Sequence, residues 1–391
     1  MKPTVWTIVL FAAAAAACGD NHAALDASPN PSDDGSGMDG GTIDGAGAPS
    51  TINVVAGDFT AGDPGIMTTV DDRSHSTAED RAPGAIGDDP VSRLDAANGV
   101  LYVINRADSN NLVQLDTAFQ NIQQFSTGSG TNPQDVAVVG TKFYVATLAG
   151  DGLEVFDTSG SGSAFTPIAL GSDDPDGQPN CNSAFAVGTN VYVSCELLDN
   201  TKQNLPPRGN GVVKVIDTST DTVATTIKLT EKNPFGQFEL LPDGNLAIAT
   251  VDFTDGAGCV LEVDTTANTA ACMAGLNNTD LGGLFGGSDA TYASRMSITG
   301  DQKTMLIASP APDFSSALLV SYDFASTTLG TPVTPVDEVI GDVTACPDGN
   351  IAVTDTGSAA GVRIYRGSAE LTTTPITIGL APLSAHGLQC Y

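Results

Sequence analysis

Short apolar runs separated by Gly, Asp, Asn and Ser recur from residue 51 to residue 391. The stretch from Pro133 to Ser159 shows one unit clearly: an apolar run, a turn at Gly140, and a second run containing Tyr144-Val145-Ala146. A loop and a third run that closes on Asp157 complete the unit. Runs of this length with this punctuation are typical of antiparallel strands. The pattern therefore predicts a hairpin to which a further strand is added.

The third run of this unit, a few apolar residues closing on Asp, marks a repeat along the chain. Its copies are Ile66 to Asp71, Leu112 to Asp116, Leu153 to Asp157, Val212 to Asp217, Val260 to Asp264 and Leu318 to Asp323, and a seventh copy without the Asp is Val362 to Arg366. The marks lie between 41 residues apart (Asp116 to Asp157) and 60 residues apart (Asp157 to Asp217). Such spacing is expected of four-stranded propeller blades with variable loops.

Second strands are predicted before these marks. They are Leu101 to Asn105, Phe143 to Thr147, Val191 to Cys195, Leu246 to Thr250, Met305 to Ser309 and Ile351 to Asp355. At the C-terminus, Ser384 to Tyr391 is a first, inner strand with nothing after it, whereas Ile52 to Asp71 supplies a second and a third strand. We therefore predict an all-β, seven-bladed β-propeller over residues 51–391, closed by N-terminal strands that pair with the C-terminal strand, which leaves no open edge.

Several of these strands resemble the YVTN-repeat family of seven-bladed propellers. The likeness is carried by Tyr102-Val103-Ile104-Asn105, Tyr144-Val145-Ala146-Thr147 and Val215-Ile216-Asp217-Thr218-Ser219-Thr220, and it extends over about residues 51–391. Propeller types that depend on a recurrent Trp fit less well, because the chain's single Trp lies at position 6. The resemblance implies a propeller fold.

The N-terminus has the pattern of a targeting segment. Residues 1–17 contain Lys2, the apolar run Val5 to Ala17 and small residues up to Cys18, and residues 18–50 are rich in Asp, Gly, Ala, Ser and Pro. We predict a signal peptide over residues 1–17 and a disordered acidic tether over residues 18–50. The Ala-Ala-Ala-Cys boundary resembles the lipobox of bacterial lipoproteins, which implies lipidation of Cys18, although Ala15 stands where Leu is commonest. The alternatives are an ordinary secretory signal or a transmembrane anchor, for which the apolar run is short.

Charge and location narrow the possible partners. Against 15 Lys and Arg stand 46 Asp and Glu, a net charge of −31, which argues against binding nucleic acid or an anionic membrane surface through charge. The predicted location is the bacterial cell envelope, anchored to a membrane by lipid and facing the periplasm or the cell surface. We expect a monomer.

Six cysteines follow Cys18, and outside the cytoplasm they predict three disulfides. Cys181 and Cys195 flank the turn at residues 188–190, and Cys259 and Cys272 flank residues 265–266, so that each pair would lie across a hairpin. Cys346 and Cys390 would join neighbouring inner strands. A redox or metal role is the alternative, but the chain has no Cys-x-x-Cys spacing.

Conventional catalytic motifs are missing, but aligned inner strands reveal a set of polar positions. Four residues before Val139, Cys346, Cys390 and their equivalents stand Arg93, Asp135, Ser183, Gln237, Arg295, Asp342 and His386. We predict that these seven residues, here named the ring, lie at the channel mouth and bind an organic ligand carrying a carboxylate or similar anion. The alternatives are a merely wet channel, or pairing of Asp135 with Arg93 and Asp342 with Arg295, which would leave no site.

Two acidic loops, Ser172 to Gly177 and Asp252 to Gly256, offer oxygen ligands for calcium, but neither has the EF-hand spacing, which favours turn formation by Asp and Gly as the explanation. The long loop Glu196 to Gly211 is a candidate recognition element. The sequence thus favours a lipoprotein whose propeller binds a small ligand or an envelope protein, with no chemistry, no metal and no cofactor of its own. The alternatives are a channel-mouth enzyme such as a lactonase or lyase, and a structural role in envelope assembly.

Overall fold

The computed structural model describes residues 50–391 except residues 61, 96–97, 108, 117, 159–164, 288, 334–338 and 383–385. The predicted signal peptide, the lipidation site at Cys18 and nearly all of the predicted tether lie outside the described residues. Within them, no helix has the length and apolar character needed to cross a membrane.

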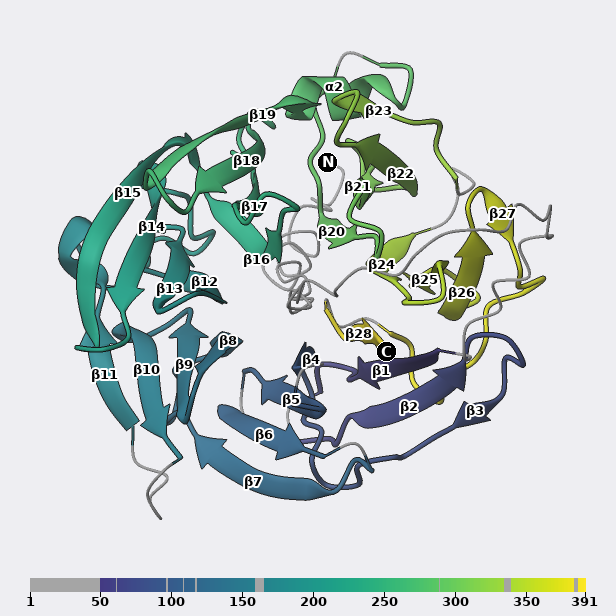
Figure 1. Cartoon of the computed structure of the whole chain (residues 1–391), viewed down its shortest axis with the longest axis horizontal. Helices are drawn as coiled ribbons and strands as arrows, with labels where there is room; N and C mark the ends of the chain where they lie inside the picture. Colours follow the sequence, from purple (N-terminus) through teal and green to yellow (C-terminus); the bar gives the residue numbers. More distant parts are fainter. Residues whose placement is uncertain are drawn as a thin grey trace, which may run out of the picture.

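The described strands form seven sheets of four strands arranged in a ring (Figure 1). The first complete sheet contains β4 (Pro90–Asp95), β5 (Val100–Asn105), β6 (Asn111–Leu115) and β7 (Asn121–Ser126). The second contains β8 (Pro133–Val139), β9 (Lys142–Thr147), β10 (Gly152–Asp157) and β11 (Phe165–Ala169), and the third contains β12 (Cys181–Val187), β13 (Asn190–Cys195), β14 (Asn210–Asp217) and β15 (Thr222–Lys232).

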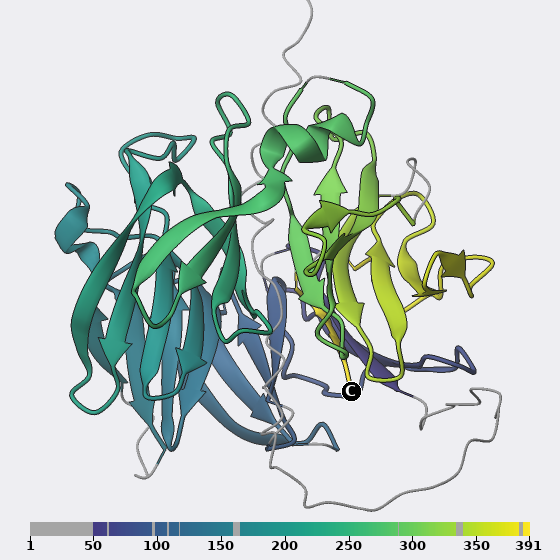
Figure 2. The ribbon, with the colours of Figure 1, turned by 45° about the horizontal axis from the view of Figure 1, so that its top comes forward.

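The fourth sheet contains β16 (Pro234–Leu240), β17 (Leu246–Thr250), β18 (Cys259–Asp264) and β19 (Thr269–Asn277). The fifth contains β20 (Arg295–Ile298), β21 (Thr304–Pro310), β22 (Ala317–Asp323) and β23 (Thr328–Leu329). The sixth contains β24 (Ile340–Ala345), β25 (Asn350–Asp355), β26 (Gly361–Arg366) and β27 (Ala369–Glu370). Two short helices, η1 (Gly171–Asp173) and α2 (Asn278–Gly283), lie in loops between sheets, and Figure 2 shows α2 at one end of the ring.

The seventh sheet closes the ring with strands from both ends of the chain. Its order is β28 (Leu388–Cys390), β1 (Thr51–Ala56), β2 (Ile66–Asp71) and β3 (Thr77–Ala78), and Figure 1 shows the yellow β28 beside the purple β1. Ile52 is paired with Cys390, and the backbone N–H of Thr51 donates to the carbonyl of Tyr391 over 2.8 Å. The predicted seven-bladed fold and its closure are therefore confirmed.

The Asp at the end of most third strands has a local structural role. Asp217 Oδ1 accepts the backbone N–H of Ser219, Asp264 Oδ1 that of Thr266, and Asp323 Oδ1 that of Ser326. Asp side chains bond in this way to the backbone that follows them in tight turns. The residue that marks the repeat in the sequence therefore shapes the turn into the outer strand.

The apolar side chains of the described residues form seven core clusters, and each lies between two neighbouring sheets. Each sheet is covered on both faces by its neighbours, so that its middle strands are buried on both sides. This explains apolar runs such as Leu101 to Ile104. The apolar cores thus lie between neighbouring sheets. Around the axis, the inner strands carry buried polar side chains such as Arg93 and Asp135.

All three predicted disulfides are present: Cys181–Cys195, Cys259–Cys272 and Cys346–Cys390. The first two stay within one sheet, whereas the third joins the end of β24 to β28 in the closing sheet. Three disulfides fit a location outside the cytoplasm.

Candidate functional site

The sequence-predicted ring does come together around the axis, but inside the molecule. Its seven side chains lie on the inner strands or, for His386, just before β28, and each residue exposes 5% or less of its surface. The ring is therefore a buried polar layer rather than the rim of an open channel mouth. Ligand binding by the ring stays a prediction.

Asp135 is the most heavily bonded member of the ring. Arg93 donates to it through Nε over 2.7 Å and through Nη2 over 2.6 Å. Asp135 Oδ2 also accepts the hydroxyl of Ser183 and the backbone N–H of Ala184, both over 2.9 Å. Three neighbouring inner strands are thus joined by one carboxylate, as in the paired alternative that the sequence left open.

β-bulges explain why polar side chains turn toward the axis at this level. The strand register shifts between Pro133 and Asp135, and between Cys181 and Ser183. Equivalent shifts fall between Phe235 and Glu239, and between Ile340 and Asp342. A bulge redirects a side chain and leaves a backbone group outside the ladder.

The ring residues pair with backbone N–H groups of the next inner strand. Asp135 accepts that of Ala184, Ser183 Oγ accepts that of Phe238 over 2.9 Å, and Asp342 Oδ2 accepts that of Leu388 over 3.0 Å. The carbonyl of His386 in turn accepts the N–H of Ser92 over 2.8 Å. The ring thus joins successive blades.

Asp342 and Arg295 do not form the doubly hydrogen-bonded pair that Arg93 and Asp135 form. Asp342 Oδ1 lies 3.8 Å from His386 Nδ1, and Arg295 donates to the carbonyl of Ser294. Burial raises the pKa of Asp342 to about 7, and the nearby positive charge of Arg295 opposes that rise.

The two acidic loops already contain bound cationic side chains. Nη2 of Arg208, from the long loop, lies 2.8 Å from carboxylate oxygens of both Asp176 and Asp199, and its Nε lies 3.6 Å from Asp174. Lys232 Nζ lies 2.6 Å from Asp252 in the other loop. Carboxylate oxygens of Asp176 and Asp252 that calcium would use are therefore engaged with guanidinium or ammonium groups, and calcium binding stays a prediction.

Metal ligation has one further candidate among the described side chains, the group Glu231, Cys259 and Cys272. The two cysteines form a disulfide, so that neither sulfur is a thiolate able to bind a metal ion. This group is therefore a disulfide beside an acidic residue.

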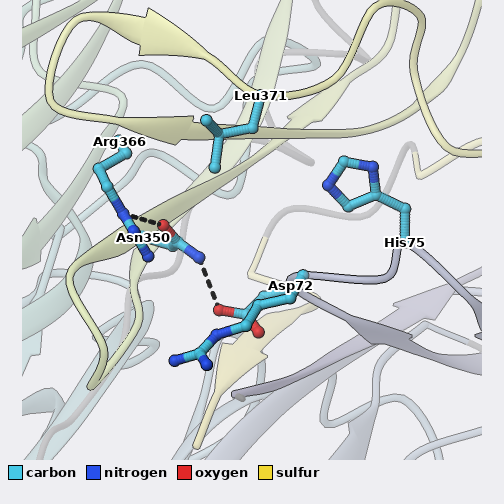
Figure 3. Close-up of a pocket in the computed structure, with 6 residues that line it drawn as sticks. Asp72, His75, Asn350, Arg366 and Leu371 are labelled. Carbon is cyan, nitrogen blue, oxygen red and sulfur yellow. Dashed lines mark hydrogen bonds between the residues drawn. The ribbon is translucent and has the colours of Figure 1, made fainter. Parts of the chain in front are cut away.

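An open pocket lies elsewhere, between the closing sheet and the sixth sheet. Its residues lie after the end of β2, at the start of β25 and at or after the end of β26. It has a volume of about 410 Å³ and is lined by Asp72, Arg73, His75, Asn350, Arg366 and Leu371. Figure 3 shows His75 on the opposite side of the pocket from Arg366 and Asn350. No sequence motif indicated this pocket, because its residues come from both ends of the domain.

Hydrogen bonds fix the polar floor of this pocket. Asp72 Oδ1 accepts the backbone N–H of Ser50 over 2.9 Å, and Asp72 Oδ2 accepts the Asn350 amide over 2.7 Å. Arg366 Nε donates to Asn350 Oδ1 over 2.8 Å, and its Nη2 lies 3.4 Å from Asp348 Oδ2. Burial raises the pKa of Asp72.

Comparisons with known proteins support the fold alone. No protein-family model and no curated protein matches the chain. Among solved structures, it is similar to the Cps50 (Swd1) β-propeller domain of Myceliophteria thermophila, with a TM-score of 0.59, 9% identity, and coverage of 81% of this chain and 99% of that one. Hydrazine synthase of Kuenenia stuttgartiensis has a TM-score of 0.53 at 15% identity, with coverage of 75% and 88%. Apo AztD from Citrobacter koseri has a TM-score of 0.52 at 11% identity, with coverage of 88% and 98%, so that this chain shares a β-propeller fold with proteins of very different sequence.

Proposed function

We propose that the chain is a binding module of the cell envelope, held to a membrane through lipid on Cys18, whose propeller binds an organic anion in the pocket beside Arg366. The observation that carries the proposal is a pocket of about 410 Å³ that offers hydrogen-bond donors and an apolar side chain. Pockets of this volume suit small organic ligands.

The pocket offers more free hydrogen-bond donors than acceptors, because most of its acceptors are already bonded within the protein. Both carboxylate oxygens of Asp72 and the amide oxygen of Asn350 already accept hydrogen bonds. Arg366 uses two of its donor groups on Asn350 and Asp348, its side chain is 57% exposed, and a guanidinium has five N–H donors. A ligand in this pocket must therefore supply acceptors, and a carboxylate matches a guanidinium through two parallel hydrogen bonds.

The charge distribution points the same way. Only 15 Lys and Arg occur among 391 residues, yet Arg73 and Arg366 both line this pocket, where one carboxylate, that of Asp348, lies 3.4 Å from each guanidinium. Leu371, which is 41% exposed, offers apolar contact to the carbon part of a ligand. The pocket thus suits a small carboxylate with an apolar segment.

The test is calorimetric titration of the protein with succinate and with succinamide, its neutral diamide. We expect binding of succinate only, and a loss of at least about tenfold in affinity in Arg366→Gln, because a charge-assisted pair is removed. Lys303→Gln is the matched control, since it also removes one positive charge, from a side chain that is 77% exposed. Equal binding of succinamide, or unchanged binding in Arg366→Gln, would overturn the proposal.

A third variant separates this pocket from the ring. Gln237→Met alters the ring, and it should bind succinate as the unmodified protein does. If Gln237→Met abolishes binding while Arg366→Gln does not, the ligand site is the ring. The cavity that Gln237 lines has a volume of about 10 Å³ and is too small for a lactone. The enzymatic alternative therefore gains no support there.

A further inference from the structure

A small cavity lies against the ring, between the inner strands β16 and β20. It is lined by Phe235, Gly236, Gln237, Ala249, Ala293, Ser294, Arg295, Met296 and His386. Its volume is about 10 Å³, so it accommodates one water molecule or one monatomic ion. Because Gln237 is 1% exposed and His386 is fully buried, bulk water does not reach their polar atoms.

Gln237 and His386 bring unsatisfied polar atoms to this cavity. Among the described residues, the amide nitrogen and oxygen of Gln237 and both ring nitrogens of His386 have no hydrogen-bond partner. The carboxylate nearest to His386 Nδ1 lies 3.8 Å away, beyond hydrogen-bond distance. Buried polar groups are almost always hydrogen-bonded, and the exceptions require an explanation such as a bound ion or water.

The cavity also coincides with an interruption in the blade-to-blade bonds of the ring. Ser183 Oγ accepts the N–H of Phe238 on the next strand, whereas the side chain of Gln237, at the next ring position, makes no bond to any described residue. Apolar Ala, Met and Phe side chains line part of the remaining space, beside Gly236, Ser294 and Arg295. An occupant that accepts a hydrogen bond from the Gln237 amide nitrogen would therefore satisfy the donor left at this interruption.

The electrostatic environment distinguishes the possible occupants. Burial, followed by the positive charges of Arg295, Arg106 and Arg93, lowers the pKa of His386 well below its usual value. Arg93 is paired with Asp135 and Arg106 with Asp89, and Arg295, which donates to the carbonyl of Ser294, lines the cavity. The positive charges that disfavour an imidazolium also disfavour a metal cation and favour an anion. The carboxyl of Asp342 lies 3.8 Å from His386 Nδ1, and burial raises its pKa to about 7, which reduces the negative charge that would oppose an anion.

We propose that this cavity is a site for a monatomic anion the size of a halide, bound by the Gln237 amide, the His386 imidazole and the charge of Arg295. A carboxylate or phosphate is too large for the space. The site is separate from the pocket beside Arg366, and neither proposal depends on the other.

The first test compares thermal unfolding of the full chain in potassium gluconate, chloride and bromide at constant ionic strength. We expect the unfolding temperature to rise with the logarithm of the chloride or bromide concentration above Kd, by on the order of 4 °C at a hundredfold excess over Kd. Bromide-soaked crystals should show an anomalous peak in the cavity. No difference between the salts, or a water molecule in place of the peak, would overturn the proposal.

Two variants test the residues. Gln237→Met keeps the volume and removes the amide donors, and Gln237→Glu places a negative charge where the anion would bind. Both should lose the halide dependence, whereas the control Lys303→Gln should keep it. If both Gln237 variants keep the full halide dependence of the unfolding temperature, that dependence arises in another part of the protein. If a variant fails to fold, the bromide peak in crystals of the unmodified protein still tests the proposal.

Discussion

Arg93 on β4 and Asp135 on β8 are joined by two parallel hydrogen bonds of 2.7 and 2.6 Å between neighbouring inner strands. Both residues are buried, and the same carboxylate also accepts bonds from Val136, Ser183 and Ala184. This arrangement makes the ion pair part of the framework that holds three blades in place around the axis.

Replacing Arg93 with Met should therefore destabilise the propeller strongly. Asp135 would stay buried without its charged partner, and loss of one member of such a pair costs about 3–5 kcal/mol. Urea denaturation measures the change, with Lys303→Gln expected to stay within about 0.5 kcal/mol of the unmodified protein. A loss below about 1 kcal/mol in Arg93→Met would contradict the role given to this pair.

The three disulfides should contribute unequally to stability. Cys346 and Cys390 are separated by 44 residues, against 14 and 13 for the two hairpin bonds. Chain entropy then gives about 4 kcal/mol for the closing bond and ~3 kcal/mol for each hairpin bond. Chemical denaturation of the three paired Cys→Ser variants tests the order, and equal losses would count against this account of ring closure.

Stability should rise as the pH is lowered from about 8.5 to about 6.5. Burial, aided by the charge of Asp151, raises the pKa of Glu154 to about 8, and burial likewise raises the pKa of Glu196 to about 8. Because the folded protein keeps protons that the unfolded chain has released, its stability is lost as the pH rises through these folded-state values. Below about pH 6.5, protonation of His386 in the unfolded chain acts in the opposite direction.

The measurement is the urea midpoint across this pH range. Glu154→Gln and Glu196→Gln should each flatten the profile, because an amide does not titrate. A midpoint that increases with pH in the unmodified protein would show that these carboxyl groups are ionised in the folded state.

Lipidation at Cys18 is testable by metabolic labelling with a fatty acid. We expect label on the unmodified protein, and neither label nor membrane association in Cys18→Ala. The reason is that acylation needs the thiol at the end of the Ala-Ala-Ala-Cys boundary. Label that persists in Cys18→Ala would place the modification elsewhere, and an unlabelled, secreted protein would favour the ordinary signal peptide.

The fold class, the number of blades and the cysteine pairs could all be predicted from the amino-acid sequence. These features repeat or are local: Asp217 and Asp264 recur because each turn needs the same side chain, and Cys181 directly faces Cys195 across one hairpin. Even the closure was visible, because Ser384 to Tyr391 and Ile52 to Asp71 are incomplete in complementary ways.

The depth of the ring inside the molecule and the positions of the cavities depend on tertiary packing and could not be predicted. Periodicity placed Arg93 and Asp135 on inner strands, but how closely seven inner strands approach one another depends on packing and on bulges that the sequence pattern does not reveal. The pocket beside Arg366 was equally inaccessible to sequence reasoning, because Asp72 and Asn350 are 278 residues apart and meet only when the last blade packs against the closing one. Strand pattern is local chemistry, whereas a cavity is what packing leaves between strands that are distant in the chain.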